Sequence, residues 1–217
     1  MNPFKRAQID LKNKSRLMDN RFGESSPIDN KKLPNMPRGS AVVISKEVKQ
    51  VLDLIQELTA EERIEIPFLL CGKNEGQVVY FDKVVAGSSG LSGTEADFSS
   101  LVPDLQEFIN KSPKNGTDIV AHGHSHPKSI NNYHLNFSLG DMNAYKNFRL
   151  DNPVFATGKI ELCSCLLTGG NYNFLFFDGN DYYKFEHVYV QDKNGNIVEQ
   201  LPCYRSNFVN TNDRGRY

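Results

Sequence analysis

Metal-binding residue types are concentrated in one stretch of the chain, VAHGHSHPKSINNYHLNFSLGD, which runs from Val120 to Asp141. His122, His124 and His126 alternate there with small residues at the end of an apolar run. In a β-strand, alternating side chains point to the same face of the sheet, so neighbouring imidazoles can reach one metal ion. Catalytic zinc sites combine three protein ligands, often histidines, with a water molecule. The spacing therefore predicts a zinc site at the end of a strand.

Asp141 is the candidate for the third ligand, because it ends the tetrad Ser138-Leu-Gly-Asp141. The same tetrad fits a helix capping box, in which a serine N-cap is followed three residues later by an acidic side chain. The two interpretations are compatible. A capped helix N-terminus is a rigid position from which to direct a carboxylate at a metal ion.

A zinc site of this kind also needs a general base. Glu65 is the candidate, because it lies at the start of an otherwise apolar segment, IEIPFLLCGK, which predicts a strand. The alternative is that Glu65 marks a solvent-facing strand end. Glu61 and Glu62 are the other acidic residues nearby that could act as the base.

Three elements in this order resemble the JAMM metalloprotease signature of MPN domains. They are Glu65, then His124-Ser-His126-Pro127, then Ser138-x-x-Asp141. The resemblance extends over roughly residues 40–190. It implies an α/β (α+β) fold of the cytidine-deaminase-like MPN type, with a mixed, mostly antiparallel sheet flanked by helices.

The resemblance also implies a role for each residue. His124, His126 and Asp141 would bind Zn²⁺, Glu65 would take a proton from water and return it to the leaving amine, and Ser138 would donate a hydrogen bond to the oxyanion. The implied reaction is hydrolysis of an amide bond in a protein or peptide. In this family it is often the isopeptide bond between a ubiquitin-like C-terminus and a lysine.

Two alternatives remain open at this point. The chain could be a non-catalytic MPN-type scaffold that binds a protein partner, because the interval Pro127–Gly140 is longer than in the family pattern. We interpret residues 128–137 as a lengthened loop. The chain could also be another metal-dependent hydrolase with a His-x-His pair, but such enzymes need more ligands downstream than His134 and His187 supply.

The other polar residues have plainer interpretations. We expect His122 to lie beside the metal ligands rather than to bind the metal, and His134 to be exposed. His187 lies in an aromatic strand and is expected to be structural. Cys163 and Cys165 alternate, which predicts two buried thiols on one face of a strand rather than a second metal site.

Periodicity and turn residues predict the elements that position these residues. Ser45 is the predicted N-cap of the first helix, and Pro103 lies in the first turn of the second. Strands are predicted at 41–45, 64–73, 76–87, 117–127, 158–169, 171–179 and 181–192, and helices at 46–58, 102–112 and 138–150.

Composition and charge bound the remaining possibilities. The chain has 217 residues, of which 39% are hydrophobic and 24% charged, as in ordinary globular domains. Residues 1–38 hold nine Lys/Arg and four Asp/Glu, a balance of +5, so the remainder carries −6 of the total −1. We divide the chain into a basic, flexible N-terminal extension (1–38), an MPN-type domain (39–192) and a C-terminal hairpin or tail (193–217).

The acidic body makes nucleic acid an unexpected partner, although the basic extension could be either a solvated tail or an arm that docks on an acidic partner. No apolar run approaches the roughly 20 residues of a membrane helix, so no membrane association is expected. The N-terminus has no secretory pattern, and the four cysteines are expected to be reduced thiols, which predicts a cytoplasmic protein.

Overall fold

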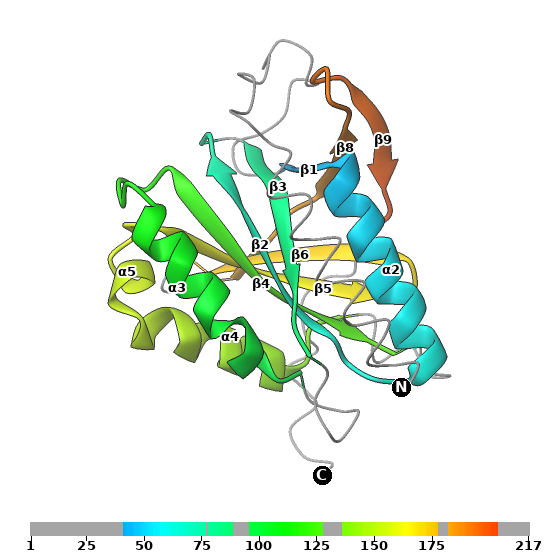
Figure 1. The fold of residues 1–217 in the computed structure, drawn as a ribbon, viewed down its shortest axis with the longest axis horizontal. Coiled ribbons are helices and arrows are strands. Elements are labelled where there is room, and N and C mark those ends of the chain that lie inside the picture. The colour runs from blue at the N-terminus through cyan, green and yellow to red at the C-terminus, as the bar shows by residue number, and fades with distance from the viewer. Residues whose placement is uncertain (1–40, 77, 89–95, 128–135, 178–181, 204–217) are drawn as a thin grey trace.

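A computed structural model of the protein describes residues 41–76, 78–88, 96–127, 136–177 and 182–203. Figure 1 shows one strongly curled sheet with helices packed against it. The predicted N-terminal extension, residues 89–95 and most of the predicted loop at 128–137 lie outside the described residues. Within the described part of the chain, no helix is long and apolar enough to cross a membrane.

The sheet contains nine described strands in the order β7-β6-β5-β4-β2-β3-β1-β8-β9. Five of the eight pairings between described strands are antiparallel and three are parallel, so the predicted mixed, mostly antiparallel sheet is confirmed. The strands are β1 (Ala41–Ser45), β2 (Pro67–Asn74), β3 (Val78–Ala86), β4 (Asp118–His126), β5 (Glu161–Thr168), β6 (Asn171–Phe177), β7 (Tyr182–Lys184), β8 (His187–Gln191) and β9 (Ile197–Leu201). The helices are α2 (Lys46–Glu62), the 3₁₀ helix η2 (Phe98–Leu101), α3 (Val102–Lys111), α4 (Leu139–Asp151) and α5 (Pro153–Ala156).

The first helix follows the sequence signals closely. The Ser45 hydroxyl accepts a hydrogen bond from the Val48 backbone N–H at 3.1 Å, as predicted for an N-cap. The apolar stripe of α2 is buried against one face of the sheet, together with residues from β1, β2, β3 and β5. The helix runs to Glu62, one turn beyond the predicted end, and residues 63–66 then connect it to β2.

The strands predicted at 64–73 and 76–87 are present as the antiparallel pair β2 and β3, but the first begins at Pro67 rather than at residue 64. Glu65 therefore precedes the strand. Proline within a strand usually indicates an edge strand or a bulge, yet β2 lies between β3 and β4 inside the sheet. Proline is tolerated there because it is the first residue of the strand. The bulge occurs further along, between Cys71 and Gly72.

The opposite face of the sheet is covered by η2, α3 and α4. Buried residues from these helices pack on β2, β4, β5 and β6 in a second apolar cluster. Tyr145 of α4 ties the helix to the sheet, since its hydroxyl donates to the Leu162 carbonyl at 2.7 Å and accepts from the Phe177 N–H at 3.1 Å. Helix α2 therefore covers one face of the sheet, and helices α3 and α4 cover the other.

The prediction of one strand over residues 181–192 is wrong. The segment forms two strands: β7 lies at one end of the sheet order, and β8 is next to last at the other, between β1 and β9. Phe185, between them, is buried in the cluster under α2. The sheet curls enough that the Tyr172 N–H at the start of β6 donates to the Pro202 carbonyl after β9 at 2.9 Å. Residues 197–201, which belong to the predicted C-terminal hairpin or tail, pair with β8 as β9.

Candidate metal centre

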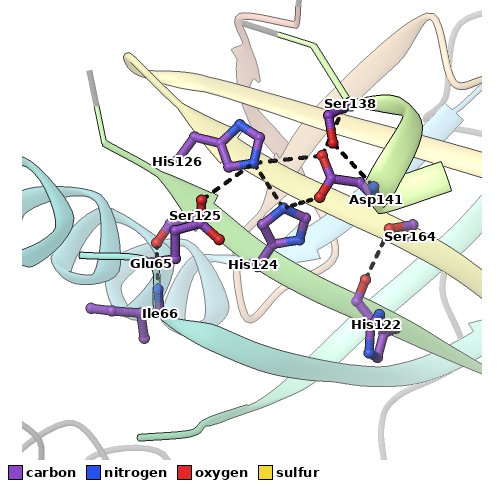
Figure 2. A network of polar contacts seen from close by, with 9 residues as sticks. All are labelled: Glu65, Ile66, His122, His124, Ser125, His126, Ser138, Asp141 and Ser164. Carbon is purple, nitrogen blue, oxygen red and sulfur yellow. Dashed lines mark hydrogen bonds and ion pairs between the residues drawn. The ribbon is translucent and has the colours of Figure 1, made fainter. Parts of the chain in front are cut away.

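Two of the histidines on β4 converge at the end of the strand (Figure 2). The Nε2 atoms of His124 and His126 lie 3.0 Å apart, and both side chains are buried. β4 is held on both sides, by antiparallel pairing with β2 and parallel pairing with β5. The alternation of the sequence therefore places two imidazoles side by side on a rigid central strand.

Asp141 reaches the same point from the N-terminus of α4. The capping box is complete, since the Ser138 N–H donates to Asp141 Oδ2 at 2.7 Å and the Asp141 N–H donates to Ser138 Oγ at 3.1 Å. One carboxylate oxygen is thus fixed by the cap, and the whole side chain is directed at the histidines (Figure 2). The capping-box interpretation of the Ser-x-x-Asp tetrad is confirmed, and the capped carboxylate also faces both imidazoles.

The separations between these donor atoms suit a tetrahedral zinc ion. Asp141 Oδ1 lies 3.2 Å from His124 Nε2, and Asp141 Oδ2 lies 3.6 Å from His126 Nε2. Ligands about 2.0–2.1 Å from a tetrahedral ion lie about 3.3 Å from one another. Two imidazole nitrogens and one carboxylate form a donor set that zinc prefers, so these residues fit the ion.

Glu65 is the second carboxylate at the site, and it lies slightly further out. Its Oε1 is 3.8 Å from His126 Nε2, and single donor atoms of Glu65, His124 and His126 all fall within 4.8 Å of one another. Glu65 could therefore be a ligand in place of Asp141. Asp141 is the better third ligand because it is closer to both imidazoles, which leaves Glu65 beside the metal position.

The connection from α2 to β2 sets the position of Glu65. Arg63 ends the helix in the left-handed conformation, with φ 53° and ψ 44°. Pro67 restricts the residue before it to extended conformations. Glu61 and Glu62, the other candidate bases, are exposed in the last turn of α2. A short connection that is restricted at both ends thus presents Glu65, rather than either of these, to His126.

The electrostatics of the site keep Asp141 ionised. Burial opposes ionisation of this carboxyl, but the hydrogen bond and charge of His124, the charge of His126 and the Ser138 N–H together hold its pKa well below the usual range. A metal ion at this position would take the place of imidazole protons, because histidine binds a metal as the neutral ring and a carboxyl group binds it as the anion.

His122 lies on the same face of β4 but outside the cluster. Its ring is stacked between Phe98, with centroids 3.6 Å apart, and Phe148, at 4.7 Å. Burial and the charge of His124 lower its pKa to about 3 against the opposing effect of Asp141, so the ring is neutral at pH 7. His122 therefore packs under the site, in keeping with the expectation that it is not a ligand.

A hydroxyl pair on the other face of β4 was not foreseen from the sequence. Ser125, between the two converging histidines, hydrogen-bonds Thr59 of α2 and accepts from the Ile66 N–H at 3.0 Å. Both hydroxyl residues are buried. One feature of the sequence could have indicated this pair. Thr59 is a polar residue that lies four positions after Ile55, on the apolar stripe of α2.

Three of the remaining candidates, His187, Cys163 and Cys165, lie apart from the centre. His187 is on β8, where it stacks on Tyr189 at 6.0 Å. Cys163 and Cys165 are fully buried in the cluster under α2, as predicted, and burial raises the pKa of both thiols. His134 lies outside the described residues.

Comparison with known proteins adds little to this geometry. No protein-family model matches the chain. No curated protein matches it. Among solved structures, the chain is similar to the solution structure of a protein from Desulfitobacterium hafniense, with a TM-score of 0.45 and 15% identity. The match covers 70% of this chain and 93% of that one.

Proposed function

We propose that this chain is a zinc-dependent metallopeptidase of the JAMM type, built on a cytidine-deaminase-like MPN domain, which hydrolyses an amide or isopeptide bond. The observation that carries the proposal is the convergence of His124, His126 and Asp141 at donor separations of 3.0–3.6 Å, with Glu65 3.8 Å from one of the imidazoles. The order and types of these residues match the JAMM signature.

His124, His126 and Asp141 would hold the zinc ion. A bound Zn²⁺ lowers the pKa of water and polarises a carbonyl group, which is the chemistry that amide hydrolysis requires. The two neutral imidazoles and the anionic carboxylate would leave a net positive charge at the site, which favours an anionic transition state.

Glu65 is the proposed general base. Its carboxylate is fixed beside the imidazoles rather than between them, so that it can accept a proton from the attacking water and return it to the leaving amine. General acid–base catalysis by one positioned side chain contributes typically about 10²–10⁴-fold to a rate.

Ser138 is the proposed oxyanion donor. It lies exposed at the N-terminus of α4, and its Oγ accepts the Asp141 N–H, which leaves the hydroxyl hydrogen free to be donated. The partial positive charge of the helix N-terminus adds to the stabilisation of negative charge at this position.

The proposed substrates are proteins or peptides, and the C-terminal tail of a ubiquitin-like protein in amide linkage is the first to test. The test begins with the zinc content of the purified protein, measured by elemental mass spectrometry. About one zinc per chain is expected, with loss of zinc in His124→Ala. His187→Ala is the matched control, because it removes a histidine on β8 and should retain the metal.

Hydrolysis of ubiquitin-like and peptide amides is then compared between the wild type and Glu65→Gln. The variant should keep its zinc and lose about 10²–10⁴-fold in kcat. Wild-type activity in Glu65→Gln would remove the assigned base. A folded wild type that binds no zinc on reconstitution would favour a non-catalytic MPN-type scaffold that binds a protein partner.

A further inference from the structure

The chemistry proposed above depends on where Glu65 lies, yet this residue belongs to neither a helix nor a strand. It sits in the connection 63–66 between α2 and β2, and its carboxylate must stay near His126. A side chain on an irregular segment keeps a fixed position only if the backbone beside it is held by specific contacts. The contacts that hold this segment therefore bear on the reaction.

Ser125 makes two such contacts with the neighbouring residue, Ile66. The Ser125 N–H donates to the Ile66 carbonyl at 3.2 Å, and the Ile66 N–H donates to Ser125 Oγ at 3.0 Å. The first contact extends the pairing of β2 with β4 by one residue. The second comes from a side chain, so it depends on the residue type at position 125.

The same hydroxyl is also joined to α2. Ser125 Oγ and Thr59 Oγ1 are hydrogen-bonded, and either atom can be the donor. Their side chains are excluded from solvent, with 0% and 2% exposure, so water cannot replace either partner. Ser125 thus links three elements at one point: helix α2, the Glu65 connection, and the strand that carries both histidines.

Position 125 suits this task for a geometric reason. His124 and His126 point to the α4 face of β4, so the residue between them points to the α2 face. A serine at this position leaves the candidate metal-binding atoms undisturbed, and it holds the Glu65 connection from the opposite face of β4 (Figure 2). An alanine would keep the main-chain contact but would leave the Ile66 N–H and the Thr59 hydroxyl without their shared partner.

We propose that Ser125, together with Thr59, is a positioning residue that holds Glu65 at the metal centre through the backbone of Ile66. The proposal rests on the proposed function. In this proposal Ser125 does not contact the substrate. Because Thr59 lies on α2, the packing of this helix becomes a determinant of the rate.

The test compares Ser125→Ala with Ser164→Ala. Ser164 is the matched control, because it is also a buried serine whose hydroxyl bonds a β4 carbonyl, that of His122, at 3.0 Å, but it has no contact with the Glu65 connection. The first readout is hydrogen exchange of the Ile66 amide by NMR. Exchange should be about tenfold or more faster in Ser125→Ala and unchanged in Ser164→Ala.

The second readout is kinetic. In Ser125→Ala, kcat should fall about 10–100-fold with KM and zinc content unchanged, because misplacing a reacting group by about 1 Å can cost about 10² in rate. Combined with Glu65→Gln, Ser125→Ala should have no further effect, since residues acting through one group are not additive. A merely structural role would instead lower kcat by the same factor in both backgrounds.

Thr59→Val is the second variant, which keeps the test decisive if Ser125→Ala does not fold. It should speed exchange at Ile66 and lower kcat in the same direction, and Thr59→Ser should restore both. Unchanged exchange in Ser125→Ala and Thr59→Val would overturn the proposal, as would faster exchange with an unchanged kcat. An inactive wild type would defeat the proposed function, and the exchange measurement would still decide whether Ser125 fixes the Glu65 connection.

Discussion

Gly123 is the position where adding a single methyl group, as in Gly123→Ala, should disturb both the fold and the candidate metal centre. It lies on β4 between His122 and His124 and pairs with Phe68 of β2. A Cβ atom at this position would lie 2.2 Å from Cε2 and 2.4 Å from Cζ of the Phe68 ring. Phe68 is fully buried, so the ring has no open space into which it can move. We therefore predict that Gly123→Ala destabilises the protein.

The size of the expected destabilisation follows from the overlap between the new Cβ atom and the Phe68 ring. Ordinary contacts of a Cβ begin at about 3.4 Å, so the ring or the strand must shift by about 1.2 Å. Overpacking of a dense core costs typically about 1–3 kcal/mol. For a chain of this size, 1 kcal/mol corresponds to about 2–4 °C in Tm, so a decrease of about 2–12 °C is expected. If β4 itself shifts, His124 leaves its position and zinc content falls as well.

Thermal unfolding and zinc content of Gly123→Ala measure both effects. Gly140→Ala is the control, since its Cβ would make only a 3.4 Å contact with Ser138 Oγ and alanine favours the helix. Combining Gly123→Ala with Phe68→Leu should recover part of the loss, because the smaller side chain makes room for the methyl group. A Tm for Gly123→Ala equal to that of the wild type, or strictly additive losses in the double variant, would refute this account of the packing.

Two further predictions concern the connection to β2 and the thiols. Arg63→Gly should raise the free energy of unfolding by about 0.5–1 kcal/mol, or about 1–4 °C in Tm, because glycine adopts the left-handed conformation without strain. Arg63→Ala should give no gain, and equal Tm values for the two variants would count against the argument. In the native protein, Cys203 should react with iodoacetamide while the fully buried Cys163 and Cys165 stay protected until unfolding, as mass spectrometry of the peptides can show, and rapid labelling of Cys165 would contradict its burial.

The elements predicted correctly are those whose signals are local. Ser45 and Ser138 cap helices because their hydroxyls reach backbone N–H groups three residues away, which the sequence shows directly. β4 and its alternating histidines follow from a short-range pattern. The convergence of His124 with Asp141 required only that a strand end lie near the helix that follows it.

The failures arise where partners are distant in the sequence. Residues 181–192 have the sequence pattern of one aromatic strand. In the structure the first part pairs with β6 as strand β7, and the second part pairs with β1 as strand β8. Alternation alone cannot show this division, because both halves have it. The hydrogen bonds of Ser125 cannot be predicted from local pattern for the same reason, since its partners Thr59 and Ile66 lie about sixty residues earlier in the chain.

Two independent devices direct the two carboxylates of the site. Asp141 is fixed by a capping box on a helix that Tyr145 anchors to the sheet. Glu65 is fixed by a restricted connection that Ser125 holds to β4. The two histidines between them lie on β4, which carries Ser125 and which pairs with β5, the strand that Tyr145 contacts. Because each carboxylate is placed by its own protein contacts, the donor atoms would need little rearrangement to hold the proposed metal ion, which would reduce the cost of binding and keep the proposed base clear of the ligand positions.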